Sequence, residues 1–187
     1  MSRFVDRGAV VAAYVGIGMA LVIAVSFLLI IPIEPIMWLA ALPAGLLIGY
    51  YANQRSDRRA GPVWRIGVNG VFAGAATGLT LVIVLLGVKA LFFNADDGYR
   101  DPGLGGSFTC ETGAECVYQR YSEDQAADLA AAGVTDATTF SAFYWAQQWS
   151  TAGFVLAVTL VGSLGGALIY AIARPRGTRA AGAAPSA

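Results

Sequence analysis

The sequence predicts an all-α integral membrane protein with four transmembrane helices, and three observations support this fold class. Of the 187 residues, 57% are hydrophobic and 13% are charged, a composition typical of chains that reside in lipid. Four long apolar runs contain no charged residue. Most of the basic residues flank these runs on what would be one face of the membrane.

The apolar runs cover residues 9–31, 35–51, 66–88 and 149–173. Each is close to or above the roughly 20 residues that a helix needs to cross about 30 Å of hydrocarbon. Only helices or closed barrels satisfy backbone hydrogen bonds in lipid, and these runs lack the two-residue alternation of barrel strands. The first run is too long for the apolar part of a signal peptide, and no small-x-small cleavage pattern follows it, so we expect it to be retained.

The positions of the arginines predict the orientation, because short cytoplasmic flanks carry an excess of Lys and Arg. Nine of the twelve basic residues precede the first run, lie between the second and third, or follow the fourth: Arg3, Arg7, Arg55, Arg58, Arg59, Arg65, Arg174, Arg176 and Arg179. Residues 94–148 contain nine acidic and two basic residues. We therefore expect both termini inside (N-in/C-in) and a large external loop between helices three and four.

The predicted topology divides the chain into four parts. Residues 1–93 hold helices one to three with a cytoplasmic loop at 52–65, residues 94–148 form the external loop, residues 149–173 form helix four, and residues 174–187 form a disordered cytoplasmic tail. Only three residues, Pro32, Ile33 and Glu34, join the first two helices, which predicts an antiparallel hairpin. Pro43 predicts a kink in helix two.

The external loop has local signals for order. The segment 122–125 has the form of a capping box before residues 126–132, and Gly133 is placed as a C-terminal cap. One short surface helix is expected there. A further helix is expected to begin at about Asp136 and to continue into the membrane as helix four.

Cys110 and Cys116 are the only cysteines, and both lie in the segment assigned to the outside. We expect them to form a disulfide that shapes the external loop. The alternative is a thiol oxidoreductase. The spacing is not Cys-x-x-Cys, however, and the neighbours Glu111 and Glu115 disfavour a thiolate.

Small residues recur at four-residue spacing, most clearly Gly70, Gly74 and Gly78 on helix three. Such residues form a groove that allows another helix backbone to approach closely. Similar stripes occur at Ala41, Gly45 and Gly49, at Ala12, Gly16 and Ala20, and at Gly162 and Gly166. Two interpretations stay open: packing within the bundle, or a partner interface on any stripe that the bundle leaves uncovered. Asn69, Thr77 and Thr80 are candidates for hydrogen bonds between helices.

Lys89 is the one basic residue near the hydrocarbon. Its ammonium group is expected to reach the outer interface by snorkelling, with an ion pair to Glu34 as an addition. The acidic external loop has three interpretations: a solvated loop, a docking surface for a partner, or a calcium site at Asp96, Asp97 and Asp101.

The absence of histidine excludes most catalytic and haem chemistry that depends on imidazole. No carboxylate lies within an apolar run. We therefore expect no enzyme, no cofactor and no metal. The sequence favours a non-catalytic accessory or structural subunit of a larger membrane complex. Its alternatives are a small transporter or channel component acting as a homo-oligomer, and an extracytoplasmic thiol oxidoreductase. Expected partners are membrane lipid and other membrane protein subunits, with no nucleic acid. The Ala, Gly and Arg bias suits a bacterial plasma membrane.

Overall fold

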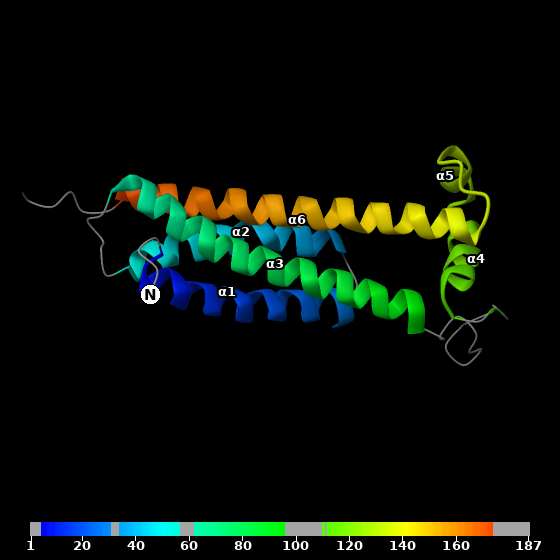
Figure 1. Ribbon diagram of the computed structural model, residues 1–187, viewed down its shortest axis with the longest axis horizontal. Helices are drawn as coiled ribbons and strands as arrows, with labels where there is room; N and C mark the ends of the chain where they lie inside the picture. The colour runs from blue at the N-terminus through cyan, green and yellow to red at the C-terminus, as the bar shows by residue number, and fades with distance from the viewer. Residues whose placement is uncertain (1–4, 31–33, 57–61, 96–109, 111, 174–187) are drawn as a thin grey trace, which may run out of the picture. The chain divides into compact units, whose positions relative to one another are not determined.

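The computed structural model describes residues 5–30, 34–56, 62–95, 110 and 112–173, except for the side chains at 29, 30 and 34–36. All regular structure in these residues is helical (Figure 1). The elements are α1 (Arg7–Val25), a π-helical turn (Ser26–Ile30), α2 (Glu34–Gln54), α3 (Val63–Ala95), α4 (Ala114–Asp124), α5 (Ala126–Ala131) and α6 (Ala137–Ala173). The all-α class is as the sequence predicts.

Three of the described helical segments are long and apolar enough to cross a membrane. They are Arg7–Leu28, Val63–Ala95 and Ala137–Ala173. The 21-residue α2 is not among them, and it contains Pro43, whose nitrogen has no hydrogen to donate to the helix. The structure is thus consistent with a multi-pass membrane protein. The hairpin residues Pro32 and Ile33 and the tail 174–187 lie outside the described residues.

α3 and α6 extend beyond the apolar segments from which the sequence predicts them. α3 has 33 residues and α6 has 37, whereas the runs at 66–88 and 149–173 have fewer. α6 begins next to Asp136, where the sequence places the start of this helix. At about 1.5 Å per residue, α6 is about 55 Å long, so it has more residues than the hydrocarbon requires.

The chain forms two compact units. The first contains residues 1–80 and 156–187. In it, α1, α2 and the adjoining parts of α3 and α6 lie side by side (Figure 1). Its core is built mainly from small side chains, because helices in lipid associate through close backbone packing. One buried cluster combines Ala9, Ala12, Ile48, Ala52 and Ala73.

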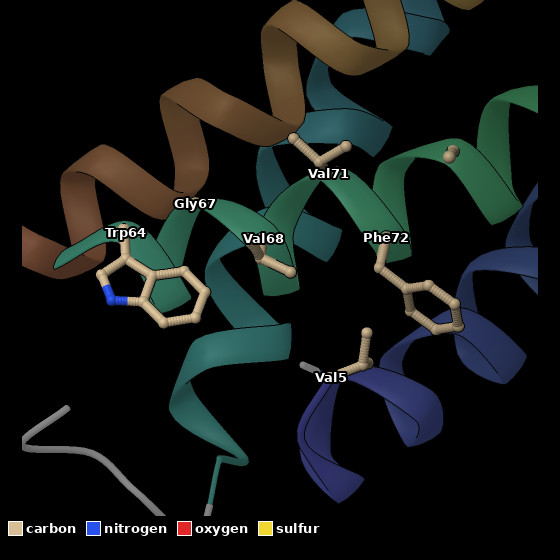
Figure 2. A pocket seen from close by; sticks show the side chains of 7 residues that line it. Val5, Trp64, Gly67, Val68, Val71 and Phe72 are labelled. Carbon is tan, nitrogen blue, oxygen red and sulfur yellow. The ribbon is translucent and has the colours of Figure 1, made fainter. Parts of the chain in front are cut away.

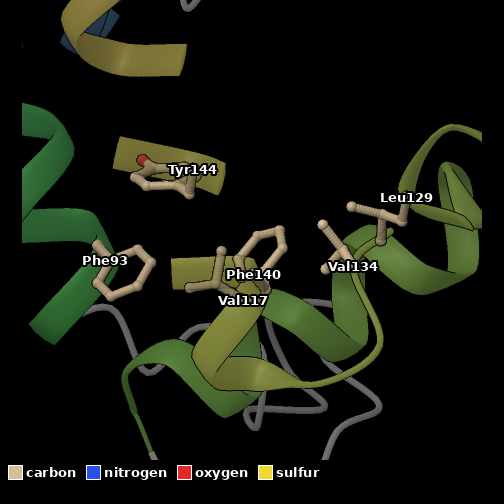
Figure 3. Close-up of a cluster of buried hydrophobic side chains, with 6 residues drawn as sticks. All are labelled: Phe93, Val117, Leu129, Val134, Phe140 and Tyr144. Carbon is tan, nitrogen blue, oxygen red and sulfur yellow. The ribbon is translucent and has the colours of Figure 1, made fainter. Parts of the chain in front are cut away.

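The second unit contains residues 81–155 and has an aromatic core. Figure 3 shows the six buried side chains of this aromatic cluster: Phe93, Val117, Leu129, Val134, Phe140 and Tyr144. The ring of Phe93 lies 4.9 Å from that of Tyr144, centroid to centroid, and the ring of Tyr121 lies 5.2 Å from that of Phe140. Burial of these large rings gives the short helices α4 and α5 a core that they could not form alone.

The predicted capping box at 122–125 is wrong. Ser122 lies inside α4, where its hydroxyl donates a hydrogen bond to the carbonyl oxygen of Tyr118 at 2.8 Å. The residue before α5 is Gln125, and it makes no side-chain capping bond. The structure therefore has two short helices here, because residues 114–124 bury Cys116 and Val117 on one side and form a helix of their own.

Gly133 ends α5 as the sequence predicts. Its φ is +72°, and the N–H of Val134 donates to the carbonyl oxygen of Leu129 at 2.9 Å. This is the hydrogen bond of a Schellman cap, which favours glycine at the left-handed position. The cap turns the chain so that Val134 and Leu129 both enter the aromatic cluster.

Candidate functional site

A buried polar cluster joins three helices of the first unit. The Ser56 hydroxyl donates to a carboxylate oxygen of Asp6 at 2.6 Å, and the Asn69 side-chain amide donates to the same oxygen at 3.2 Å. The backbone N–H of Asp6 donates to the Asn69 side-chain oxygen at 3.3 Å. Asp6 precedes α1, Ser56 follows α2 and Asn69 lies in α3, so this Asp6 cluster fixes the ends of three helices together.

Asn53 extends the Asp6 cluster toward α2. Its side-chain amide donates to the carbonyl oxygens of Gly49 at 2.9 Å and Ile66 at 3.1 Å, and Asn69 donates to its side-chain oxygen at 3.4 Å. Asn53 and Asn69 are almost fully buried, with exposed fractions of 1% and 2%. Their polar groups are paired with protein, as buried groups must be to avoid a large desolvation cost.

Of the three polar residues predicted on α3, Asn69 bonds to another helix by donating to the side-chain oxygen of Asn53 in α2. Thr77 and Thr80 instead donate to the carbonyl oxygens of Ala73 and Ala76 in their own helix, at 2.9 and 2.8 Å. Back-bonding of this kind is a common way for a threonine to satisfy its hydroxyl inside a helix.

The stripe Gly70, Gly74 and Gly78 faces α6. A Cβ added at Gly74 would lie 2.5 Å from the Ser163 Cβ, and one added at Gly70 would lie 2.9 Å from the Ala167 Cβ. The Ser163 hydroxyl donates to the carbonyl oxygen of Gly70 at 2.5 Å. Close approach of α3 and α6 therefore brings a hydroxyl within reach of a backbone carbonyl that side chains would otherwise shield.

The glycines of α2 and α6 contact each other's backbone. Cβ atoms added at Gly45 and Gly49 would collide with the carbonyl oxygens of Thr159 and Ser163. In the reverse direction, a Cβ added at Gly162 would lie 2.5 Å from the carbonyl oxygen of Leu42. A Cβ added at Gly16 on α1 would collide with the Thr77 hydroxyl. These stripes are therefore covered by helices of the same chain.

An apolar groove lies along α3 in the first unit. Figure 2 shows Trp64, Val68 and Phe72 extending from α3, with Val5 facing them from the residues before α1. The groove has a volume of about 590 Å³ and also includes Gly67, Val71 and Ala75. Apart from the Trp64 indole N–H, its lining side chains carry no polar group, so the surface of the groove is apolar.

The cysteine pair lies at the start of α4. The sulfur atoms of Cys110 and Cys116 are 2.07 Å apart, at disulfide-bonding distance. Cys116 is 1% exposed and precedes Val117, which belongs to the aromatic cluster. The pair thus closes a short loop directly beside the core of the second unit.

The remaining predicted residues are placed as follows. Lys89 lies in α3, one turn before Phe93, and is partly buried. Glu34 begins α2, but its side chain is not among those that the structure describes. The predicted ion pair between Glu34 and Lys89 therefore lies outside the described residues. Asp96, Asp97 and Asp101, the candidate calcium ligands, also lie outside the described residues. Among the residues that are described, no group of three or more His, Cys, Asp or Glu gathers as a metal site would.

The comparisons with known proteins give no relative. No family model, curated protein or solved structure matches this chain.

Proposed function

We propose that this chain is a non-catalytic integral membrane protein with four crossings and both termini inside, and that it serves as an accessory subunit of a larger membrane complex. In this proposal the helices of the first unit anchor the protein. Within the second unit, the residues between α3 and α6, which include α4 and α5, present a surface outside the membrane, where a partner subunit binds.

The contacts of α2 support a fourth crossing. Gly45 and Gly49 of α2 lie against Thr159 and Ser163 of α6, so the two helices run in the same direction with a constant register. Gly70 and Gly74 of α3 lie against Ala167 and Ser163, so α3 runs in the opposite direction. Over residues 42–50, α2 therefore runs alongside a helix that is long and apolar enough to span a membrane, which favours a crossing in the same direction.

The observation that carries the accessory role is the ordered second unit. It combines the aromatic cluster, a cysteine pair at bonding distance and a Schellman cap. Its described surface is acidic, with Glu115, Glu123, Asp124 and Asp128 all exposed. A rigid charged surface favours specific recognition of a partner, since less conformational entropy is lost on binding.

Purification from native membranes in mild detergent tests this role. The expected result is one or more foreign membrane subunits that co-purify in fixed ratio. The triple change Glu123→Lys, Asp124→Lys and Asp128→Lys should release them, because it reverses the charge of the exposed surface. A matched control is Glu123→Asp, Asp124→Glu and Asp128→Glu, which changes the same three positions but keeps their charge and should leave the partner bound.

Two other results would reject the accessory role. A discrete homo-oligomer without foreign subunits would favour a small transporter or channel component. Robust thiol-exchange turnover, abolished by Cys110→Ser or by Cys116→Ser, would favour the oxidoreductase.

A further inference from the structure

We propose that α1 and α2 form a binding site for the phosphate headgroup of an anionic phospholipid, with Arg7 and Arg55 as its two cationic ligands. Both arginines line one pocket of about 370 Å³, together with Gly8, Val11 and Tyr51. Arginine recognises phosphate well because its planar guanidinium group presents paired N–H donors.

Close packing of two helices brings the two arginines to this pocket. Gly8 of α1 lies against the end of α2. A Cβ added at Gly8 would collide with the carbonyl group of Arg55 and would lie 2.6 Å from the backbone nitrogen of Ser56. Arg7 and Arg55 are the adjoining residues on the two sides of this contact. Two like charges that line one small pocket repel each other unless an anion lies between them. The packing therefore creates a site that an anion stabilises.

The Arg55 side chain is held in position by Tyr51. Its Nε donates to the Tyr51 hydroxyl at 3.2 Å, and its guanidinium carbon lies 5.5 Å from the centre of the Tyr51 ring. The cation–π contact uses one face of the guanidinium group, and the hydrogen bond uses its Nε. Its two terminal nitrogens are left to meet a ligand.

Asp6, which precedes Arg7 in the sequence, makes other hydrogen bonds. The Asp6 carboxylate accepts hydrogen bonds from Ser56 and Asn69 in the Asp6 cluster. In the part of the chain that the structure describes, no carboxylate forms an ion pair with Arg7 or Arg55. The N-terminus of α1, which begins at Arg7, and the C-terminus of α2, which ends at Gln54, carry opposite partial charges, so the positive charge of the pocket comes from the two arginines.

The surface next to the pocket favours a lipid over a free phosphate ion. Val11 lines the pocket, and Val15, Gly18 and Val22 continue its helical face along α1. The three valines are exposed, and nothing lies within 4 Å of a Cβ added at Gly18. An acyl chain attached to the bound phosphate would follow this apolar face into the hydrocarbon. Basic pockets beside cytoplasmic helix ends are typical headgroup sites.

Lipid titration of the detergent-purified full chain tests the site. We expect phosphatidylglycerol to raise the thermal unfolding midpoint and to remain bound in native mass spectrometry, with phosphatidylcholine at least about tenfold weaker. The change Arg7→Gln with Arg55→Gln should weaken phosphatidylglycerol binding about tenfold or more, since it removes two charge-assisted contacts. The matched control Arg176→Gln with Arg179→Gln removes the same charge from the predicted cytoplasmic side and should bind as the wild type.

Three results would overturn the proposal: equal affinity for phosphatidylcholine, equal loss in the control variant, or displacement of the lipid by millimolar inorganic phosphate, which would indicate a free-phosphate site. If the double variant does not fold, Tyr51→Phe serves instead and should weaken binding about fivefold by releasing Arg55. Unchanged binding in Tyr51→Phe would also count against the site. The headgroup site rests on the proposed membrane orientation. Lipid binding in detergent does not depend on that orientation, so the failure of one proposal can be distinguished from the failure of the other.

Discussion

At the scale of single residues, the Asp6 cluster is the part of the molecule that the sequence reveals least. Asp6, Asn53 and Ser56 each resemble ordinary polar residues at a helix end, and up to 63 positions separate the partners along the chain. Only the fold brings them together. Asn69 was the one member with a sequence signal, because an amide inside an apolar run needs a partner.

We predict that Asn69→Ala lowers the free energy of unfolding by about 1–3 kcal/mol, since it removes the hydrogen bonds that Asn69 makes with Asp6 and Asn53. Unfolding by sodium dodecyl sulfate in mixed micelles, followed by circular dichroism, measures the change. Asn94→Ala is the control: Asn94 is exposed and donates to the carbonyl oxygen of Ala90 one turn earlier, so its loss should change stability by less than about 0.5 kcal/mol. Equal effects of the two variants would contradict the importance of the cluster.

Asp136 provides a second prediction at this scale. Its carboxylate accepts hydrogen bonds from the N–H groups of Thr139 at 2.8 Å and Thr138 at 2.9 Å, which lowers the pKa of the carboxyl below its ordinary value. The stabilisation of the α6 start is therefore complete above the ordinary carboxyl pKa and is lost as pH falls through the lowered value. Amide exchange at Thr138 and Thr139, corrected for intrinsic rates, should accelerate over that range. In Asp136→Asn the rates should not follow this titration.

At the scale of secondary structure, the glycine stripes decide how the helices pack. The spacing of Gly45, Gly49, Gly162 and Gly166 predicts close packing but does not say which helix covers which stripe. That depends on the register of helices far apart in the sequence. The structure assigns the glycines of α2 to α6 and those of α3 to α6.

Two alanine substitutions separate packing from helix propensity. Gly49→Ala should lower stability by about 1–3 kcal/mol, because its Cβ would collide with the carbonyl oxygen of Ser163, which is fixed backbone. Gly67→Ala should be neutral or stabilising by up to about 1 kcal/mol, since nothing lies within 4 Å of the added Cβ and alanine favours the helix. The same detergent unfolding assay compares them. A stable Gly49→Ala protein would mean that α2 and α6 do not pack as described.

The short helices show where local sequence signals mislead. The pattern at 122–125 matches a capping box, but the preceding residues already form α4, so Ser122 has no helix to begin. A capping pattern identifies a helix start only where the chain before it is not helical. Gly133 was predictable because a left-handed position after a helix depends on one residue and its immediate neighbours.

At the scale of the whole molecule, composition and charge predict more than any single motif. The all-helical class follows from apolar runs that must satisfy their own backbone hydrogen bonds. Three of the helices were found long and apolar enough to cross a membrane. The orientation and the fourth crossing depend on α2, which is shorter and contains Pro43.

A reporter-fusion map of the full chain tests the four-crossing account most directly. Fusions are made at the N-terminus, at Arg58, at Glu123 and after Arg174, with a reporter that is active on only one side of the membrane. The account predicts that the N-terminus, Arg58 and the tail report the inside, and that Glu123 alone reports the outside. Arg58 on the opposite side from the N-terminus would show that α2 does not cross, and Glu123 inside would contradict the orientation.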